Sequence, residues 1–320
     1  MEQCFRHLLS VVIFSIVCQP LLFNFQIYFV NMAPQIVLMT GCSTGMGLAL
    51  VQRLARDPDH RFIIIATVIA MSEKTDLEAA VKDDIDKTVF IKELDITKDD
   101  NITEVVENVI NDHGRIDILL NIAGLAIVGI PERLTREQID KTFNVNVIGT
   151  IRLTQAVLPH MKEKQSGKII TFSSIVGRIG VPYNELYSSS KFAVEGFFEG
   201  LAAGLRAFNI RVCLIEPRQV QTELLDGLTA GLKASAEDES AFDIDRRQLR
   251  KMLARMEAGA PPLTREDIVD AVITRCIDVE KPVFRHFLGG RLAEILPKTL
   301  GDLTGESTLA IFGFEAVNAP

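Results

Sequence analysis

A serine, a tyrosine and a lysine in the second half of the chain have the types and the spacing for acid–base chemistry. Tyr187 and Lys191 are four positions apart in a segment with helical spacing, so both would lie on one helix face. Ser174 directly follows the predicted strand 168–173. A tyrosine pKa of about 10 is too high for base catalysis at neutral pH, and a neighbouring ammonium lowers it by favouring the phenolate. A Tyr/Lys pair on a surface helix is the competing interpretation, and by itself it would prevail.

A second motif is the glycine-rich turn that links the first predicted strand to the first predicted helix. It reads Thr40, Gly41, Cys42, Ser43, Thr44, Gly45, Met46, Gly47. Glycines allow the main chain to approach a pyrophosphate at the positive N-terminus of a helix. A turn selected only for tight packing remains the alternative, but its place between strand and helix favours a dinucleotide site.

Polar and small residues also follow two further predicted strands. Asp95 comes after the strand 89–94. Asn121 is the last residue of the strand 116–121, and Ala123 and Gly124 follow it. Open α/β sheets bind ligands at the carboxyl ends of their strands, although such residues also occur in ordinary turns. Asn146, in the sequence Asn-Val-Asn-Val, completes the set, and coincidence of all these features is very improbable.

The elements that must position these residues alternate along the chain. From Pro34 onward, short runs of Ile, Val and Leu alternate with segments of helical spacing. The predicted strands are 36–40, 62–66, 89–94, 116–121, 168–173 and 211–215, and the predicted helices are 45–56, 73–85, 99–113, 135–146, 148–164, 184–208 and 265–279. This pattern indicates an α/β fold with a parallel sheet covered on both faces.

Composition divides the chain and excludes several classes of protein. Residues 34–225 are the predicted core, 226–305 a more polar elaboration of the same domain on the substrate side, and 306–320 a tail.

The net charge of −8 argues against nucleic-acid binding. Five cysteines without a Cys-x-x-Cys pair argue against a disulfide framework and structural zinc. We therefore predict no metal and a reducing, cytoplasmic location.

Residues 1–33 form a hydrophobic extension. The segment from Leu8 to Val30 has 23 residues without a charge, which is long enough to cross a bilayer. Pro20 interrupts it, and only Asn31–Pro34 separate it from the first strand. A membrane anchor, a targeting piece and an extension upstream of a true start at Met32 all stay open, so membrane association is an alternative to a purely cytoplasmic location.

Together the motifs resemble the short-chain dehydrogenase/reductase family over residues 34 to 225. The matching residues are Thr40–Gly47, Asn121–Gly124, Asn146, Ser174, Tyr187-x-x-x-Lys191 and Pro217 to Thr222. The stretches YSSSKFAVEGFFEG and PVFRHFLGGRLAEILPKTLGD are similar to the branch that contains 17β-hydroxysteroid dehydrogenase type 1 and the photoreceptor-type all-trans-retinol dehydrogenase. The resemblance implies a Rossmann-like doubly wound sheet of about seven strands. It also implies a homodimer formed through helices around 135–164 and 184–208.

The resemblance further implies a role for each motif residue. Tyr187 exchanges a proton with the substrate oxygen, Ser174 hydrogen-bonds that oxygen, and Lys191 holds the nicotinamide ribose while lowering the Tyr187 pKa. Asn146 positions a proton-relay water. The implied cofactor contacts are Thr40, Gly41, Ser43, Thr44, Gly45, Met46, Gly47, Asp95, Asn121, Ala123, Gly124, Tyr187, Lys191, Pro217, Val220 and Thr222. The nicotinamide carries the hydride, so the reaction requires no metal.

Two positions depart from the family pattern. Ile122 replaces the usual second Asn of Asn-Asn-Ala-Gly. Arg218 replaces the Gly that normally follows Pro217, which puts close main-chain approach at that point in question.

Cofactor choice depends on the segment after the second strand. The first carboxylate after that strand that could bind a ribose 2′-hydroxyl is Glu73. The segment also lacks the arginine that relatives place at Ile69. Ser43 and Lys74 are the available donors. We expect a modest preference for NADP(H) over NAD(H).

The expected substrate is a hydrophobic alcohol or its carbonyl, either a retinoid or a steroid. The predicted contacts are Ser174, Val181, Tyr183, Leu186 and Tyr187, with Leu125, Val128 and Ile175 nearby, although each apolar residue alone is typical of ordinary core. A retinol dehydrogenase or retinal reductase is the leading interpretation.

Three other functions remain open. They are a 17β-hydroxysteroid dehydrogenase, a broad carbonyl reductase, and an NADP(H)-binding protein without turnover, which the two departures suggest. Retention of all four predicted catalytic residues argues against the last. Residues 224–255, whose conformation the sequence does not predict, shape the substrate site.

Overall fold

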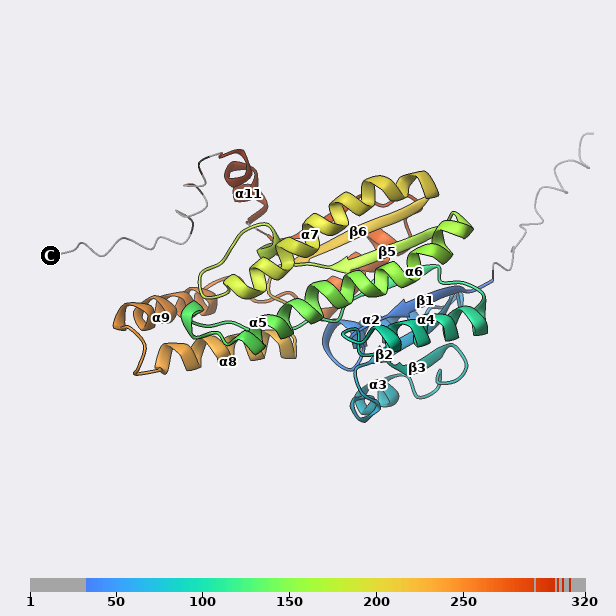
Figure 1. Ribbon diagram of the computed structural model, residues 1–320, viewed down its shortest axis with the longest axis horizontal. Helices are drawn as coiled ribbons and strands as arrows, with labels where there is room; N and C mark the ends of the chain where they lie inside the picture. Colours follow the sequence, from blue (N-terminus) through green and yellow to red (C-terminus); the bar gives the residue numbers. More distant parts are fainter. Residues whose placement is uncertain (1–32, 291, 303, 305–306, 308–310, 312–320) are drawn as a thin grey trace, which may run out of the picture. The chain divides into compact units, whose positions relative to one another are not determined.

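Figure 1 shows the computed structural model of the chain, which describes residues 33–290, 292–302, 304, 307 and 311. The hydrophobic segment predicted as an anchor or targeting piece, and most of the predicted tail, lie outside the described residues. None of the described helices combines the length and the apolar character that crossing a bilayer requires.

The described part of the chain forms one seven-stranded sheet in which every neighbouring pair of strands is parallel. Its strands are β1 (Gln35–Met39), β2 (Phe62–Val68), β3 (Val89–Glu93), β4 (Ile118–Asn121), β5 (Gly167–Phe172), β6 (Ile210–Pro217) and β7 (Arg285–Leu288). The order is β3-β2-β1-β4-β5-β6-β7. The chain therefore changes direction across the sheet between β1 and β4, which is where doubly wound folds bind their ligands. The predicted fold class is confirmed.

Helices cover both faces of the sheet. One apolar cluster packs α2 (Gly45–Ala55), α3 (Thr75–Ala80) and α10 (Arg265–Val272) against one face. A second packs α4 (Asp99–His113), α6 (Thr150–Lys164) and α7 (Glu185–Leu205) against the other, where Figure 1 shows these three helices side by side. The remaining helices are α5 (Arg136–Phe143), α8 (Glu223–Glu237), α9 (Asp243–Ala258) and α11 (Leu292–Gly301), with short segments η1 (Met71–Glu73), η2 (Pro131–Arg133), η3 (Asn144–Gly149), η4 (Ile175–Gly177), η5 (Arg206–Phe208) and η6 (Ile273–Ile277).

The structure differs from the predicted elements in two helical regions. The predicted helix 73–85 is reduced to η1 and the six-residue α3, because Leu77 is the only residue of α3 that is buried and a short helix needs packing to persist. The predicted helices 135–146 and 148–164 are joined through η3, a π-helical turn that contains the predicted catalytic Asn146. Such turns are rare and often occur at functional sites.

The region after β6 forms a hairpin of two helices, α8 and α9. Its apolar side chains form a small core of their own, centred on Leu232 and Leu249 and closed by Tyr183 and Ile130. Arg133 binds Asp238 and Ser240 at the turn of the hairpin. The segment 224–255, which the sequence left undefined, is therefore ordered by contacts with the loops that follow β4 and β5.

Candidate active site

The glycine turn between β1 and α2 has no space for side chains at two of its positions. A Cβ atom on Gly47 would lie 2.0 Å from the carbonyl oxygen of Gly41, and one on Gly41 would lie 2.9 Å from the Cα of Ala123. Gly41 also has a φ of +68°, which favours glycine. The first turn of α2 contains no acidic residue, so its amide groups keep their positive character. The main chain here fits a pyrophosphate group.

Thr40 joins this turn to the end of β4. Its hydroxyl accepts hydrogen bonds from the amides of Ile122 and Ala123, each at 3.0 Å. Asn121 points inward, and its Nδ2 donates to the hydroxyls of Thr154 and Thr171. The structure therefore brings together the predicted residues Thr40, Gly41, Asn121 and Ala123. Ile122, at the position of the family's second Asn, packs its side chain on the core while its amide donates to Thr40.

Asp95 lies two residues after β3, the edge strand of the sheet. Its carboxylate accepts from the amide and hydroxyl of Thr97 and pairs with Lys98 at 3.2 Å. Burial acts to raise the pKa of Asp95, but these bonds outweigh it and lower the pKa. Asp95 is an ionised acceptor at neutral pH.

The predicted catalytic residues Ser174 and Tyr187 meet at the end of β5. Tyr187 is buried, and its phenol is hydrogen-bonded to the Ser174 hydroxyl. Burial raises the pKa of Tyr187 to about 12, and the bond to Ser174 opposes that rise. The Lys191 Nζ lies 5.6 Å from the centre of the tyrosine ring. Burial therefore dominates the pKa of Tyr187 in the described structure, and the expected lowering of this pKa by Lys191 stays a prediction.

Lys191 is held by a partner that the sequence did not reveal. Its Nζ donates to the main-chain oxygen of Phe172 at 2.8 Å, just before Ser174. Burial lowers the pKa of Lys191 to about 8, and the nearby Glu195 opposes that change. The ammonium form is thus retained at neutral pH, but with little margin.

Asn146 belongs to the π-helical turn, and three hydrogen bonds to residues outside the turn fix its side chain. Its Oδ1 accepts from the amide of Leu125, and its Nδ2 donates to the oxygen of Leu125 and to the Ser190 hydroxyl at 3.0 Å. A Cβ on Gly124 would lie 3.3 Å from Asn146 Oδ1 and 3.7 Å from Lys191 Nζ. Asn146, Gly124 and Lys191 therefore surround one point, although spacing in the sequence could not predict Ser190 or Leu125 as partners.

The segment after β6 closes the other side. The Ser174 hydroxyl lies 3.4 Å from the oxygen of Pro217, and Thr222 donates to the oxygen of Val220 at 3.2 Å. A Cβ on Gly45 would lie 3.5 Å from Thr222 Cγ2, so the start of α8 faces the glycine turn. Arg218 turns its guanidinium to the oxygen of Pro261 at 2.5 Å, which carries the side chain into a loop.

The segment after β2 is contacted by a carboxylate of the neighbouring strand. Ile69 follows β2 directly and is exposed. Glu93, paired with Val68 in the sheet, accepts from the amide of Met71 at 2.9 Å. Lys74 is paired with Glu78 at 2.7 Å. Strand register therefore brings Glu93 of β3 to this segment, a carboxylate that the sequence alone did not place there.

The predicted substrate residues divide into two groups. Leu186, which directly precedes Tyr187, is buried, and Val181, six residues before Tyr187, is half-buried. Tyr183 belongs to the small core under α8 and α9, and its hydroxyl contacts Asp245 at 2.9 Å and Gln248 at 2.6 Å. Tyr183 thus connects the segment before α7 to the hairpin, whereas its contact with a substrate remains a prediction.

Comparisons with known proteins agree with this geometry. The sequence profile described as short chain dehydrogenase matches residues 35–233. The chain is 40% identical to human retinol dehydrogenase 8 over 198 residues, which are 62% of this chain and 63% of that protein. It is 31% identical to human 17-beta-hydroxysteroid dehydrogenase type 1 over 278 residues, which are 86% and 84% of the two chains. A short-chain dehydrogenase structure from Streptomyces avermitilis aligns with a TM-score of 0.71 and 27% identity, covering 87% of this chain and 96% of that one.

Proposed function

The chain belongs to the short-chain dehydrogenase family and is an NAD(P)-dependent oxidoreductase, and from this premise we propose that it interconverts a hydrophobic alcohol and its carbonyl, with retinol and retinal as the preferred pair. The retinoid assignment is supported by the 40% identity to retinol dehydrogenase 8, although that match spans less than two thirds of the relative's own length. The half-buried side chains Leu125, Val128 and Ile175 beside the motifs suit an apolar substrate.

The cofactor's place is supported by the tightly packed glycine turn, which brings main chain rather than side chains to the start of α2. Gly41, Gly45 and Gly47 would receive the pyrophosphate, together with the amides at the start of α2. Asp95 would accept a hydrogen bond from the adenine end, and Lys191 would hold the nicotinamide ribose. When bound, the nicotinamide supplies or accepts the hydride.

The protein's own contribution to the reaction is control of one proton. In the reducing direction, the Tyr187 phenol donates its proton to the substrate oxygen, and the Ser174 hydroxyl hydrogen-bonds the same oxygen. The raised pKa of Tyr187 keeps this acid protonated at neutral pH. Lys191 and Asn146 position the groups around the phenol and connect it to solvent through a water. In the oxidising direction, the phenolate accepts the proton.

The observation that carries this proposal is the buried contact between Tyr187 and Ser174 with Lys191 beside the ring. A surface Tyr/Lys pair would be exposed, whereas Tyr187 and Lys191 are 7% and 5% exposed. Burying a phenol and an ammonium costs free energy of folding, which a surface pair would avoid.

A turnover panel tests the proposal. The protein is assayed with NADPH and NADH against all-trans-retinal, estrone and a small aromatic ketone. We expect the highest kcat/KM with all-trans-retinal. Equal activity with the small ketone would favour the broad reductase, and cofactor binding without any turnover would favour the silent binding protein.

A steroid is the second candidate substrate. It is favoured by the match to 17-beta-hydroxysteroid dehydrogenase type 1, which covers 86% of this chain and so extends over the α8–α9 hairpin. A higher kcat/KM with estrone than with all-trans-retinal would establish it.

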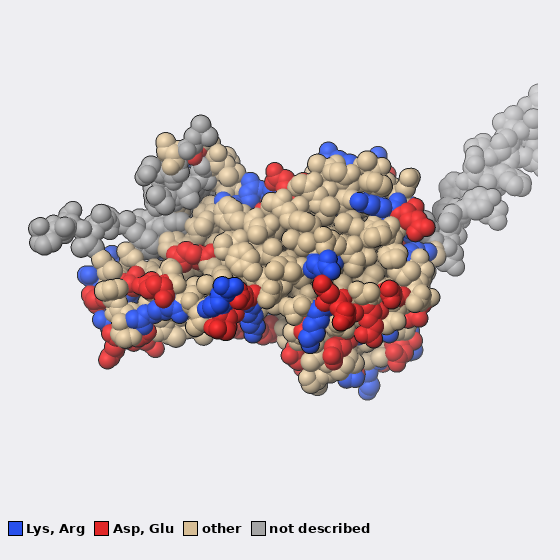
Figure 2. Space-filling view, viewed as in Figure 1, with Lys and Arg blue, Asp and Glu red and all other residues tan. Residues whose placement is uncertain are grey.

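The same family membership leads us to propose a homodimer through α5, α6 and α7. Figure 2 shows few charged side chains over α6 and α7. Large apolar side chains are exposed on this side of the fold, namely Ile139, Ile148 and Phe192, of which Ile148 is 50% and Phe192 46% exposed. Light scattering should give a dimer mass for the wild type and a monomer mass for Phe192→Lys. A monomeric wild type would reject the interface.

A further inference from the structure

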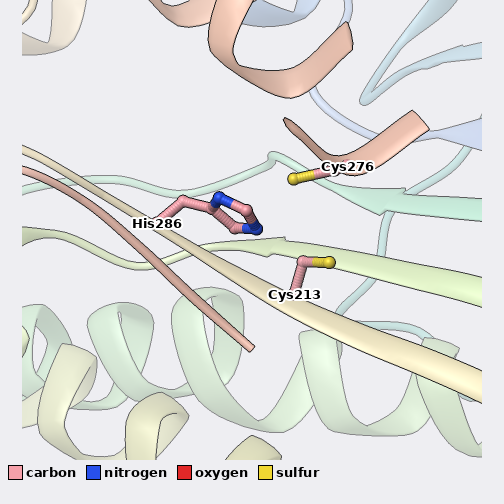
Figure 3. Close-up of side chains that lie close together, drawn as sticks. All are labelled: Cys213, Cys276 and His286. Atoms are coloured by element: carbon pink, nitrogen blue, oxygen red, sulfur yellow. The ribbon is translucent and has the colours of Figure 1, made fainter. Parts of the chain in front are cut away.

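Three side chains with metal-binding atoms meet inside the described part of the chain, away from the catalytic residues. They are Cys213, Cys276 and His286, all buried, and one ligand atom of each lies within 4.8 Å of the others. Figure 3 shows the imidazole directed toward the space between the two sulfur atoms. Neither the proton transfer nor the cofactor contacts use this cluster.

Strand register explains why the three residues converge. His286 in β7 is paired with Ile215 in β6, and Cys213 lies two residues before Ile215. Because side chains alternate between the faces of a sheet, Cys213 and His286 point to the same face. Cys276 comes from η6, which packs on that face. Two strands and one helical turn therefore each contribute one ligand atom.

The imidazole has an unsatisfied nitrogen. His286 is 5% exposed, and its Nε2 has no hydrogen-bond partner. A buried polar atom without a partner costs free energy, and a ligand bound at this nitrogen would remove that cost. A disulfide between Cys213 and Cys276 would leave this nitrogen unpaired, whereas a metal ion would bind it.

We propose that Cys213, Cys276 and His286 bind one zinc ion. Two thiolates and one neutral imidazole are a common zinc ligand set and leave the fourth tetrahedral position for water. Binding transfers the two thiol protons to solvent, and the two thiolate charges balance the charge of Zn²⁺ in the interior. The residues are far apart in the sequence, which is why spacing alone predicted no metal.

The immediate surroundings bring the two thiols and the imidazole into contact. The Cys213 side chain is hydrogen-bonded to Cys276 and to His286. The Lys168 ammonium donates to the main-chain oxygens of Cys276, Ile277 and Val279. The Lys168 ammonium is therefore bound to carbonyl groups, and its positive charge favours the deprotonated form of the nearby thiols.

Zinc at this point would fix the outermost strand. Neighbouring residues of β7 point to opposite faces, and Arg285 binds Glu195 and Glu199 of α7 as well as Glu216 of β6. Glu195 is one turn after Lys191 on α7. The metal would thus anchor β7 from one face while Arg285 ties it to the catalytic helix from the other.

Metal content is the direct test. The full chain is produced with zinc in the medium, passed over a gel-filtration column with a weak chelator, and analysed by plasma mass spectrometry. We expect about one zinc per chain in the wild type and in Cys42→Ser, a buried thiol outside the cluster, and a loss of about tenfold in Cys276→Ser and His286→Gln. Thermal unfolding should show the wild type melting about 5 °C lower after zinc is removed at high chelator concentration.

A spectroscopic test does not depend on the folding of the cluster variants. Protein produced with cobalt should show thiolate-to-cobalt absorption, and Cys4→Ser/Cys18→Ser should keep that absorption. Metal-free wild-type protein, equal zinc in Cys276→Ser, loss of the cobalt signal in Cys4→Ser/Cys18→Ser, or a Cys213–Cys276 disulfide in freshly purified protein would each overturn the proposal.

Discussion

The two halves of the sheet's carboxyl edge are built by different means. On the side of β1 to β3, the surface that suits a nucleotide is mostly main chain, and its requirement is the absence of side chains at Gly41 and Gly47. On the side of β4 to β6, the site consists of side chains whose pKa values are shifted by burial, Tyr187 and Lys191. The nucleotide half thus tolerates changes in side-chain type but not in volume, whereas the catalytic half depends on single functional groups.

The largest effect should come from the catalytic half. Tyr187→Phe removes the proton donor and keeps the ring, so kcat should fall about a thousandfold. Affinity for NADPH, measured by fluorescence titration, should stay within about threefold, because the phenol acts on the substrate oxygen. Ser189→Ala, an exposed position on the same helix, serves as the control. A parallel loss of cofactor affinity would break the proposed separation of the halves.

The pH profile sharpens the same point. Oxidation needs the Tyr187 phenolate, so below pH 8 its rate should rise about tenfold per pH unit toward the raised pKa of about 12. Above pH 8 the rise should weaken, because Lys191, with a pKa of about 8, loses its charge. Reduction uses the protonated phenol and should stay nearly flat from pH 6 to about 9. A fall in the oxidation rate with rising pH would contradict the assignment of Tyr187.

Lys191→Ala tests the residue that joins the two halves. We expect about a hundredfold lower kcat and about tenfold weaker cofactor binding, since one ammonium serves both the ribose and the surroundings of the phenol. Steady-state kinetics and cofactor titration measure the two effects separately. Loss of turnover with unchanged affinity would show that Lys191 belongs to the catalytic half alone.

Gly47→Ala tests the volume limit of the nucleotide half. The new Cβ would lie 2.0 Å from the Gly41 oxygen, so the turn must shift. Cofactor affinity should fall at least about tenfold, while kcat at saturating cofactor changes less. Gly196→Ala is the matched control, because it also lies in a helix but has nothing within 4 Å of the new Cβ. An equal effect of both variants would remove the steric argument.

The smallest effect should come from a side chain in the nucleotide half. Ile69 is 53% exposed after β2. We expect a wild-type preference for NADPH of about tenfold, a larger one for Ile69→Arg through a charge-assisted phosphate contact, and a reversed one for Ile69→Asp. Glu93→Gln should also increase the preference by removing a negative charge. Unchanged kcat/KM ratios for both cofactors in all three variants would show that this segment does not face the ribose.

The sequence predicted elements and residues whose positions depend on regular local geometry. The helix 99–113 coincides with α4, and Tyr187 and Lys191 share a face because α7 is long and regular. The seven-stranded topology followed from the family resemblance, since the hydrophobic pattern by itself did not identify β7.

Features that depend on pairing between distant strands could not be predicted. Glu93 enters the region of Ile69 only through the register of β2 and β3. The oxygen of Phe172 binds Lys191 because β5 ends beside α7. The rise that burial causes in the Tyr187 pKa was also not predicted, since a spacing argument includes the nearby charge but not the loss of solvent.

The α8–α9 hairpin, with its separate apolar core, makes this fold modular. Its packing centres on Leu232 and Leu249, and its described links to the loops after β4 and β5 include Tyr183 and the Arg133–Asp238 ion pair. The apolar residues of this separate core are not shared with the two clusters that pack on the sheet. An evolving lineage, or a protein engineer, could exchange the hairpin as a cassette and change the molecules accepted while the reaction stays the same.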